Sequence, residues 1–363
     1  MIKPIIISNY IIKQNFFSLL IITFFCCSLF LIIDLIELLR RSSSKDVPID
    51  VVIKIAILHL PSLFPIILPT VFLLSSMHSF MKLNKNSELN VMRSSGISIW
   101  FFLLPSVLNC LIISFLYVFF FNPIFSQMNI KFKSYESSYF RGNAGLHTIS
   151  KTGLWLREIN NKTEFVINAS HYSPLDNKLQ NVIIFEFDNN DSFVRRIDAS
   201  EVKMFDDRWD LKDVSVVKIN KVPELFEKMS MKFNLSIKKI EQNFRSPDTI
   251  SSWKLPDYIE NLEKSGFTAK KHIIYYNYLL SFPLIFLTMV LLGCSLSIRK
   301  ARKKKQFVNI FIGIVLGILF HFMSDVLRTL GINGSLSIFL SVWGIPIISI
   351  FILFGTLIHL EDG

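Results

Sequence analysis

Long apolar blocks lie near both ends of the chain and enclose a polar middle. A membrane-spanning helix needs about 20 mainly apolar residues. Six segments satisfy this requirement: residues 11–39, 55–80, 97–121, 273–298, 307–327 and 335–358. Within the first, the run from Phe16 to Ile33 carries no charge and is too long for a cleavable signal peptide. The pattern predicts an α-helical membrane protein with six transmembrane helices, three on each side of the polar middle.

The polar middle has the pattern of a β domain. Between residues 122 and 272 no apolar run is long enough to cross a membrane. Short β-like runs such as residues 182–187 and 211–219 alternate with turn signals. Several short strands with this spacing are typical of a sandwich, a jellyroll or an open barrel. We therefore predict membrane halves at residues 1–121 and 273–363, with an inserted all-β domain at 122–272.

The basic residues predict the orientation of the spans. The net charge is +11, but the Lys and Arg residues form short runs beside the apolar blocks, so we predict no nucleic-acid partner. With the N-terminus inside, the inner flanks carry eleven basic and three acidic residues, whereas the outer loop at 34–54 carries four of each. Cytoplasmic loops are enriched in Lys and Arg. The prediction is that both termini are cytoplasmic and that the middle domain lies outside.

Motifs of catalysis and cofactor binding are absent from the sequence. It contains no Walker A motif and no G-x-S-x-G, H-E-x-x-H or C-x-x-C pattern, and all four cysteines lie in apolar segments. His59, His78 and His321 lie singly in predicted spans, where packed histidines are commoner than proton relays. We predict neither an enzyme nor a cofactor or metal site.

The short loop between the second and third spans has an amphipathic pattern. Leu89 and Met92 are spaced for one face of a helix at about 84–95, which ends near a glycine. Ser87 or Asn86 is expected to cap the start of this helix. The segment is either a solvated connector or a coupling helix that inserts into a partner.

Two charged pairs lie near the predicted outer ends of spans. Arg40 and Arg41 end the first span, and guanidinium groups suit phosphates. The alternative is an interfacial pair within the helix, with Glu37 as the partner. Asp325 and Arg328 form a similar pair in the fifth span, and ionisable groups at membrane depth usually face a bundle interior or a cavity.

Three motifs in this order resemble the LptF/LptG family of lipopolysaccharide export permeases, and the resemblance covers nearly the whole chain. Residues 87–96 resemble its "SEL-x-VM-x-x-SG" coupling segment, and residues 153–157 its "GLW" strand. Residues 258–266 resemble its "Y-I-x-x-L-x-x-SG" helix before the fourth span, and Pro283-Leu284 also fits. The "GLW" strand and the SG ending make the chain most similar to the LptG side.

The resemblance implies a fold, a function and partners. It implies that the inserted domain is a periplasmic β-jellyroll. It also implies that the chain is a non-catalytic permease subunit in the bacterial inner membrane. This subunit would belong to an ABC transporter that extracts lipopolysaccharide and passes it to a periplasmic bridge. Its implied partners are an LptF-like permease subunit, an LptB ATPase dimer, LptC and the LptA bridge. The alternatives are the LptF-side paralogue and an ion-coupled secondary transporter, although the span centres carry almost no charge.

The resemblance also implies roles for particular residues. The coupling segment would place Glu88 in an LptB groove, and the expected ATPase-coupling residues are Glu88, Leu89, Met92 and Arg93. Arg40 and Arg41 would lie at lipid A phosphates, and the expected lipid-binding residues are Arg40, Arg41, Asp325 and Arg328. Asp34 stands where a lysine can occur in the family. At this position the chain therefore lacks one basic residue of the family's cluster at the end of the first span. Val182, Ile184, Phe165 and Ile167 are candidates for contact with acyl chains, but an ordinary β core fits them equally.

Overall fold

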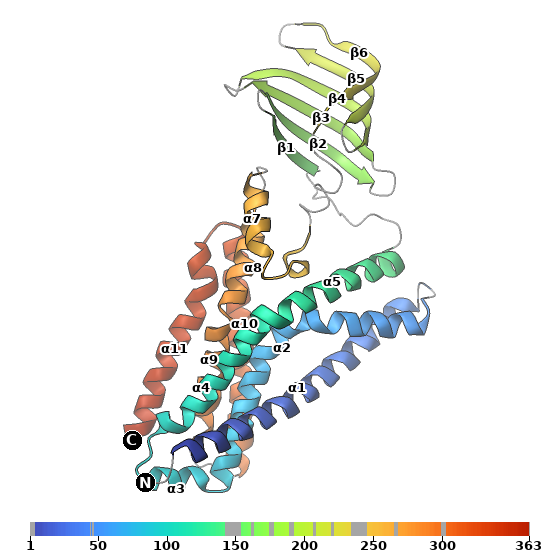
Figure 1. The fold of residues 1–363 in the computed structure, drawn as a ribbon. Coiled ribbons are helices and arrows are strands. Elements are labelled where there is room, and N and C mark those ends of the chain that lie inside the picture. Colours follow the sequence, from blue (N-terminus) through green and yellow to red (C-terminus); the bar gives the residue numbers. More distant parts are fainter. Residues whose placement is uncertain are drawn as a thin grey trace. The chain divides into compact units, whose positions relative to one another are not determined.

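The computed structural model divides the chain into two compact units. It describes residues 4–43, 45, 47–141, 154–160, 163–173, 178–188, 192–205, 208–218, 221–233, 245–264, 268–298 and 303–362. The helical unit comprises Met1–Phe132, Ile250–Leu255 and Lys270–Gly363. The β unit comprises Lys133–Thr249 and Pro256–Ala269. An antiparallel sheet is thus inserted between two helical halves, as the hydrophobic pattern predicts (Figure 1).

The helices of the chain are long and mostly apolar. The first half contains α1 (Pro4–Ser42), α2 (Ile49–Lys85), the short α3 (Glu88–Ser94), α4 (Ile99–Leu116), a π-helical turn (Tyr117–Phe121) and α5 (Asn122–Glu136). A second π-helical turn follows at Ser137–Arg141, and a 3₁₀ turn at Pro247–Thr249 precedes α7 (Leu255–Lys264). The second half contains α8 (Lys270–Leu280), α9 (Phe282–Ser297), α10 (Lys303–Ile332) and α11 (Ile338–Asp362).

The structure supports five to six spans, the sixth of them bent. Five described helical segments are long and apolar enough to cross a membrane, and α8 with α9 makes a sixth candidate that bends by 48°. The bend falls at Ser281, two residues before Pro283, whose missing amide hydrogen leaves a carbonyl of the preceding turn unbonded. The Ser281 hydroxyl donates to the Tyr278 carbonyl at 2.8 Å. The fourth predicted span is therefore divided by Pro283 into two helices, α8 and α9.

The prolines of α2 leave the helix unbroken. Pro61, Pro65 and Pro69 all lie inside it. The proline ring at 69 removes the amide hydrogen that would bond the Pro65 carbonyl one turn earlier. The Tyr278 hydroxyl of α8 donates to that carbonyl at 3.2 Å. A proline in a span frees a backbone carbonyl, and here a neighbouring helix supplies the group that satisfies it.

Glycines bring α2 close to two other helices. A Cβ at Gly293 of α9 would lie 1.9 Å from Ser76 Oγ and 2.9 Å from the Leu73 carbonyl oxygen. Gly313 and Gly317 of α10 lie against the side chains of Met77 and Leu73 on α2. The GxxxG spacing of α10 therefore serves a helix contact within the chain.

The helix after the third span belongs to the helical unit for most of its length. We predicted the boundary between the first membrane half and the inserted domain at residues 121/122. Helix α5 begins there, and the two compact units divide later, between Phe132 and Lys133. Phe132 stacks on the ring of His59 with 4.3 Å between centroids, and Phe125 packs against Phe64 at 5.0 Å. These aromatic contacts hold the first part of α5 on α2 although its sequence is largely polar.

The β unit contains one antiparallel sheet in chain order. Its strands are β1 (Leu154–Asn160), β2 (Thr163–Ser173), β3 (Lys178–Asp188), β4 (Phe193–Met204), β5 (Trp209–Lys218) and β6 (Glu224–Met231). Neighbouring strands pair in the order β1-β2-β3-β4-β5-β6. Among the strands that the structure describes, every connection is thus between neighbours, whereas a complete jellyroll also has crossovers between two sheets.

A line of irregular positions crosses the middle of the sheet. Asn181 of β3 and Asp213 of β5 have positive φ, 50° and 52°. The strand pairings place both of them opposite Ser200 of β4, and the register is the same on the two sides of this line. Ser200 Oγ donates to the Asp213 carboxylate at 2.9 Å. The register between β3 and β4 shifts elsewhere, at Glu186 and Phe187, where a bulge can add to the strong curvature of β3, β4 and β5 in Figure 1.

The irregular line changes which residues of β3 and β5 face the core. In β3 the buried positions step from Leu179 to Val182, and in β5 from Leu211 to Val214, so the alternation shifts by one residue in each strand. The core of the β unit consists of Phe165, Ile167, Ala169, Leu179, Val182, Ile184, Ile197, Ala199, Val202, Met204, Trp209, Leu211, Val214, Val216 and Phe233.

Candidate functional site

The predicted coupling segment forms the short helix α3 between α2 and α4. It ends in a Schellman motif at Gly96, where φ is 77°. The Ile97 amide donates to the Met92 carbonyl at 3.1 Å, and the Gly96 amide donates to the Arg93 carbonyl at 3.0 Å. The predicted helix with a glycine at its end is therefore confirmed, over a shorter range than residues 84–95.

The amphipathic pattern of α3 fixes it on the bundle. Leu89 is buried in the cluster formed by Ile11, Phe80, Leu83, Ile99, Phe102, Leu103, Leu291, Cys294, Ile298, Leu353 and Leu357. Met92 and Ile97 pack against the same cluster. Val91 points the other way and is 63% exposed. One face of α3 is thus anchored to the helical unit, and the other remains accessible.

Glu88 begins α3 and binds neighbours on both sides. Its Oε1 accepts a hydrogen bond from the Tyr10 hydroxyl of α1 at 3.3 Å and another from Asn86 Nδ2 at 3.0 Å. The prediction was that Ser87 or Asn86 caps the helix, and Ser87 does not. Ser87 adopts the left-handed conformation with φ 61°, and its side chain makes no capping bond. Asn86 stabilises the helix start through the Glu88 side chain instead.

The remaining polar groups of this region join it to α9 and α11. Arg93 Nη2 donates to the Leu360 carbonyl of α11 at 3.4 Å. The Ile99 amide, at the start of α4, donates to Glu361 Oε1 at 3.3 Å. Asn84 Nδ2 donates to the backbone carbonyl of Ser297 at 3.0 Å. The beginning of α1, the end of α11 and the connection between α2 and α4 therefore meet at one end of the helical unit, called here the α3 end.

At the far end of α1 the two predicted lipid-binding arginines lie side by side on one helix. Arg40 Nη2 and Nε bind the two carboxylate oxygens of Glu37 at 2.9 and 3.0 Å. Both side chains of this pair are exposed, with 75% of Arg40 accessible. Exposed ion pairs contribute little stability because water screens them. The pair with Glu37 therefore holds Arg40 only weakly.

Asp34, also in α1, has a partner that the sequence did not indicate. His59 Nδ1 of α2 lies 2.9 Å from Asp34 Oδ1. The face of the same imidazole ring stacks on Phe132 of α5. Through His59, α2 is therefore joined to α1 at Asp34 and to α5 at Phe132. The unusual aspartate was visible in the sequence, but its histidine partner carries no local signal.

Asp325 and Arg328 form the expected pair on α10, and Arg328 has a second partner. The Arg328 guanidinium binds the Asp325 carboxylate. It also lies over the Tyr278 ring, 3.9 Å from the centroid. Since the hydroxyl of Tyr278 bonds the Pro65 carbonyl, one tyrosine links α10, α8 and α2. The two predicted lipid-binding pairs thus lie on separate helices, α1 and α10, and each is bonded within its own helix.

The acyl-contact candidates of the β unit all lie in its core. Phe165, Ile167, Val182 and Ile184 are buried in the apolar cluster of the sheet. Phe165 packs edge-on against Phe233 at 5.3 Å. Their burial is what an ordinary β core requires.

Several sequence features fall outside the described residues. These are Gly153 of the "GLW" motif, the Ser265-Gly266 ending of the helix before span four, and residues 299–302 of the basic run. Within the described ranges, no group of three or more His, Cys, Asp or Glu side chains is arranged to hold a metal ion.

Comparison with known proteins agrees with the arrangement of spans, inserted sheet and α3. No curated protein matches the chain. A family model described as "Lipopolysaccharide export system permease LptF/LptG" matches residues 9–359, which is nearly the whole chain. Members of this family are non-catalytic, multi-pass inner-membrane subunits of a larger lipopolysaccharide export complex. This chain belongs to the LptF/LptG family of lipopolysaccharide export permeases.

Proposed function

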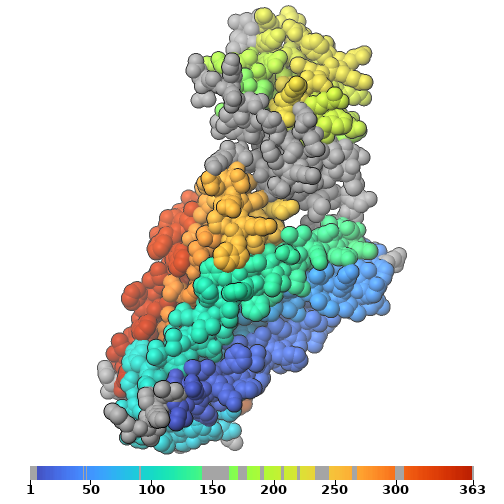
Figure 2. Space-filling model, in the orientation of Figure 1, coloured from blue at the N-terminus to red at the C-terminus, as the bar shows by residue number. Residues whose placement is uncertain are grey.

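We propose that the chain is the LptG-type half of a paired permease in an ABC transporter that extracts lipopolysaccharide from the inner membrane. The family match over residues 9–359 carries this proposal. An LptF-like chain supplies the other half of the lipid cavity, an LptB dimer hydrolyses ATP, and LptC and LptA receive the cargo. The exposed apolar surface of α1, visible in blue in Figure 2, supports a partner in the membrane.

The proposed orientation places the α3 end in the cytoplasm. The flanks at this end carry the basic excess that marks cytoplasmic loops. The contacts of Tyr10, Glu88 and Glu361 support both termini lying on that same side. The β unit is then periplasmic, and the apolar face of its sheet receives acyl chains.

In this proposal α3 transmits closure of the LptB dimer to the spans. Glu88 and Arg93 flank its accessible face and contact LptB, whereas Leu89 and Met92 transmit the movement to the bundle. Burial of Leu89 against α2, α4 and α9 supports this division of roles.

The coupling role is tested by co-purification of LptB with the Glu88→Ala variant. We expect most of the LptB to be lost while the variant still inserts. Ser94→Ala is the matched control, because that exposed hydroxyl bonds only the Val91 carbonyl of its own helix among the contacts described. Normal LptB recovery with Glu88→Ala would refute the coupling assignment.

Arg40 and Arg41 are proposed to bind lipid A phosphates, with Asp325 and Arg328 lining the same cavity from α10. The exposed Arg40–Glu37 pair supports this, because a phosphate can replace the carboxylate at small cost. The test is photo-crosslinking of lipopolysaccharide in the membrane.

Charge reversal at Arg40 and Arg41 together is expected to lower that crosslinking several-fold. Glu37→Gln is the control, since it releases Arg40 from its pair and keeps the positive charge, so crosslinking is expected to persist or rise. Unchanged crosslinking in the double reversal would mean that the arginines only anchor α1 at the membrane interface.

A further inference from the structure

The last turn of α11 lies against the connection between α3 and α4 (Figure 1). Arg93 of α3 bonds Leu360 of this turn, which lies 267 residues later in the chain. The Ile99 amide of α4 bonds Glu361 of the same turn, 262 residues later. Both bonds therefore join the two membrane halves of the helical unit at its α3 end.

The Glu361 carboxylate caps the start of α4. The Ile99 amide is the first of that helix, and the first four amides of a helix have no carbonyl to bond within it. The usual source of a cap is the residue before the helix, here Ser98, but within the described part of the chain its side chain makes no capping bond. Glu361 Oε1 accepts from the Ile99 amide at 3.3 Å instead. A carboxylate suits this place because the start of a helix carries partial positive charge.

The Arg93 guanidinium caps the end of α11 in a corresponding way. The last carbonyls of a helix lack partners within it, and this end carries partial negative charge. Leu360 is two residues before the end of α11, and its carbonyl accepts from Arg93 Nη2 at 3.4 Å. A basic side chain of α3 thus meets the negative end of α11, and an acidic side chain of α11 meets the positive end of α4. The two bonds, Arg93 to Leu360 and Ile99 to Glu361, are called here the α11 clasp.

Apolar packing supports the α11 clasp from the interior of the bundle. Leu353 and Leu357 of α11 are buried in the same cluster as Leu89 of α3. Trp100 of α4 stacks on Phe354 of α11 with 5.4 Å between ring centroids. The packing brings the three helices together, and the directional bonds of the clasp fix where the end of α11 lies on the connection.

The connection between α3 and α4 consists of residues 95–98. Gly96 lies in it with φ 77°, and an added Cβ there would meet nothing within 4 Å. Short connections of this kind absorb the change in backbone angles when helices move. Arg93 lies before the connection and Ile99 after it, so the α11 clasp ties both of its sides to one turn of α11.

We propose that Glu361 is a positioning residue for coupling: through the α11 clasp, the end of α11 sets the angle between α3 and α4 and passes the movement of α3 to the second membrane half. This inference rests on the proposed coupling role of α3. Helix α11 packs on α8, α9 and α10, so a shift of its end reaches every helix of that half. The clasp thereby adds a second path to the buried contact of Leu89 with α9.

Three variants at the end of α11 separate the possible roles of Glu361. Glu361→Ala removes the acceptor of the Ile99 amide. Glu361→Gln keeps an oxygen at the same place and removes only the charge, so it is the conservative rescue. Ile358→Ala, three residues earlier, is the matched control, because that side chain is 51% exposed. Thermal unfolding of the purified complex in detergent establishes that all three variants fold.

Hydrogen exchange of the full complex tests the contact itself. Peptides that contain the Ile99 amide are expected to exchange about five-fold faster in Glu361→Ala than in the parent, the factor that a helix cap of ordinary strength contributes. Glu361→Gln and Ile358→Ala are expected to exchange as the parent does. Unchanged exchange in Glu361→Ala would show that α11 does not cap α4 and would overturn the proposal.

Transport by the complex in proteoliposomes, with LptC and LptA as acceptors, tests the consequence for coupling. Glu361→Ala is expected to retain LptB and to hydrolyse ATP, while the amount of lipopolysaccharide exported per ATP falls several-fold. Glu361→Gln is expected to restore that ratio.

Faster exchange in Glu361→Ala with an unchanged export ratio would make Glu361 a structural cap only and would overturn its role in coupling. Loss of LptB from Glu361→Ala would make Glu361 part of the ATPase contact and would also overturn that role. Failure of the proposed function is distinguishable, because it shows as a parent complex that exports nothing, whereas the exchange measurement requires no export.

Discussion

Helices α1 and α9 are both apolar, but they lie in opposite surroundings. On α9, Phe282 and Phe286 are fully buried and Gly293 touches α2. On α1, Phe24 is 78% exposed and its neighbour Phe25 is exposed as well. The difference teaches that hydropathy identifies a span, whereas the size of its side chains and their packing decide what it contacts. Helix α9 holds the chain together, and α1 presents its surface to lipid or to a partner.

The largest expected effect comes from the contact between α9 and α2. Gly293→Val places branched carbons where Ser76 Oγ and a backbone carbonyl already lie. We expect destabilisation of about 3 kcal/mol or more, because overpacking at a backbone contact cannot be relieved by one side chain. Thermal unfolding in detergent measures it, with Gly344→Val as the control in open space. Equal stability of the two variants would contradict the rigid role given to α9.

The next effect concerns α3, which is anchored on the same buried cluster. Leu89→Ala is expected to weaken the packing of α3 on the helical unit by about 2–4 kcal/mol, the usual range for a buried leucine. Hydrogen exchange of the α3 amides reports the loss as faster exchange. Val91→Ala, on the exposed face, is the matched control and is expected to leave the exchange unchanged. Similar exchange in both variants would show that α3 is not anchored by Leu89.

A smaller effect is expected where Tyr278 joins α8 to α2. Tyr278→Phe keeps the ring under Arg328 and removes the hydroxyl, which bonds the Pro65 carbonyl and also interacts with Arg328. We expect a loss of about 1 kcal/mol in the free energy of unfolding. Tyr276→Phe, on the same helix, controls for the general loss of a phenol. If the two variants unfold at the same temperature, water satisfies the freed carbonyl as well as the tyrosine does.

The smallest effect on the chain alone is expected on α1. Phe24→Ala removes an exposed ring and should change the stability of the isolated subunit by less than about 0.5 kcal/mol. Phe286→Ala, at a fully buried ring of α9, is the opposite control and should cost several-fold more. Co-purification of the second permease subunit is expected to fall with Phe24→Ala if α1 faces that partner. A large loss of stability in the isolated Phe24→Ala subunit would contradict the comparison.

The sequence predicted the spans because run length and apolarity are local properties. The six apolar segments and the glycine that ends α3 were both visible in this way. The continuation of the third span through α5 was not, because its polar residues hide the aromatic contacts of Phe125 and Phe132 with α2. The bend at Ser281 had a visible cause in Pro283, whereas α2 continues as one helix through its prolines, and the Tyr278 hydroxyl that bonds the Pro65 carbonyl had no local signal.

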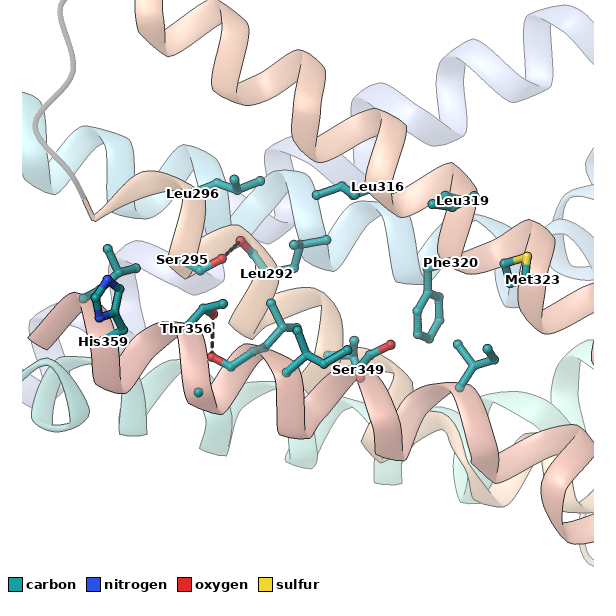
Figure 3. Close-up of a pocket in the computed structure, with 16 residues that line it drawn as sticks. Leu292, Ser295, Leu296, Leu316, Leu319, Phe320, Met323, Ser349, Thr356 and His359 are labelled. Atoms are coloured by element: carbon teal, nitrogen blue, oxygen red, sulfur yellow. Dashed lines mark hydrogen bonds between the residues drawn. The ribbon is translucent and has the colours of Figure 1, made fainter.

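The candidate sites were only partly predictable, for the same reason. Glu88, Leu89, Met92 and Arg93 were expected on one short helix, and they lie there. The pairing of Asp34 with His59, and of Arg328 with the Tyr278 ring, depends on residues far apart in the chain and has no local pattern. The structure also contains a groove between α9, α10 and α11, with Leu296, Phe320 and His359 in its lining (Figure 3). The groove depends on how these helices are placed in space, which a local stretch of sequence does not encode.

The irregular line through Asn181, Ser200 and Asp213 has a consequence for how the β unit can change. Positive φ at Asn181 and Asp213 is a property of the main chain, and the side chains of all three positions are polar and lie outside the apolar core. The core side chains can therefore become larger at one position and smaller at the next without altering this line. The inner surface of the sheet can vary during evolution while the path of its strands stays the same.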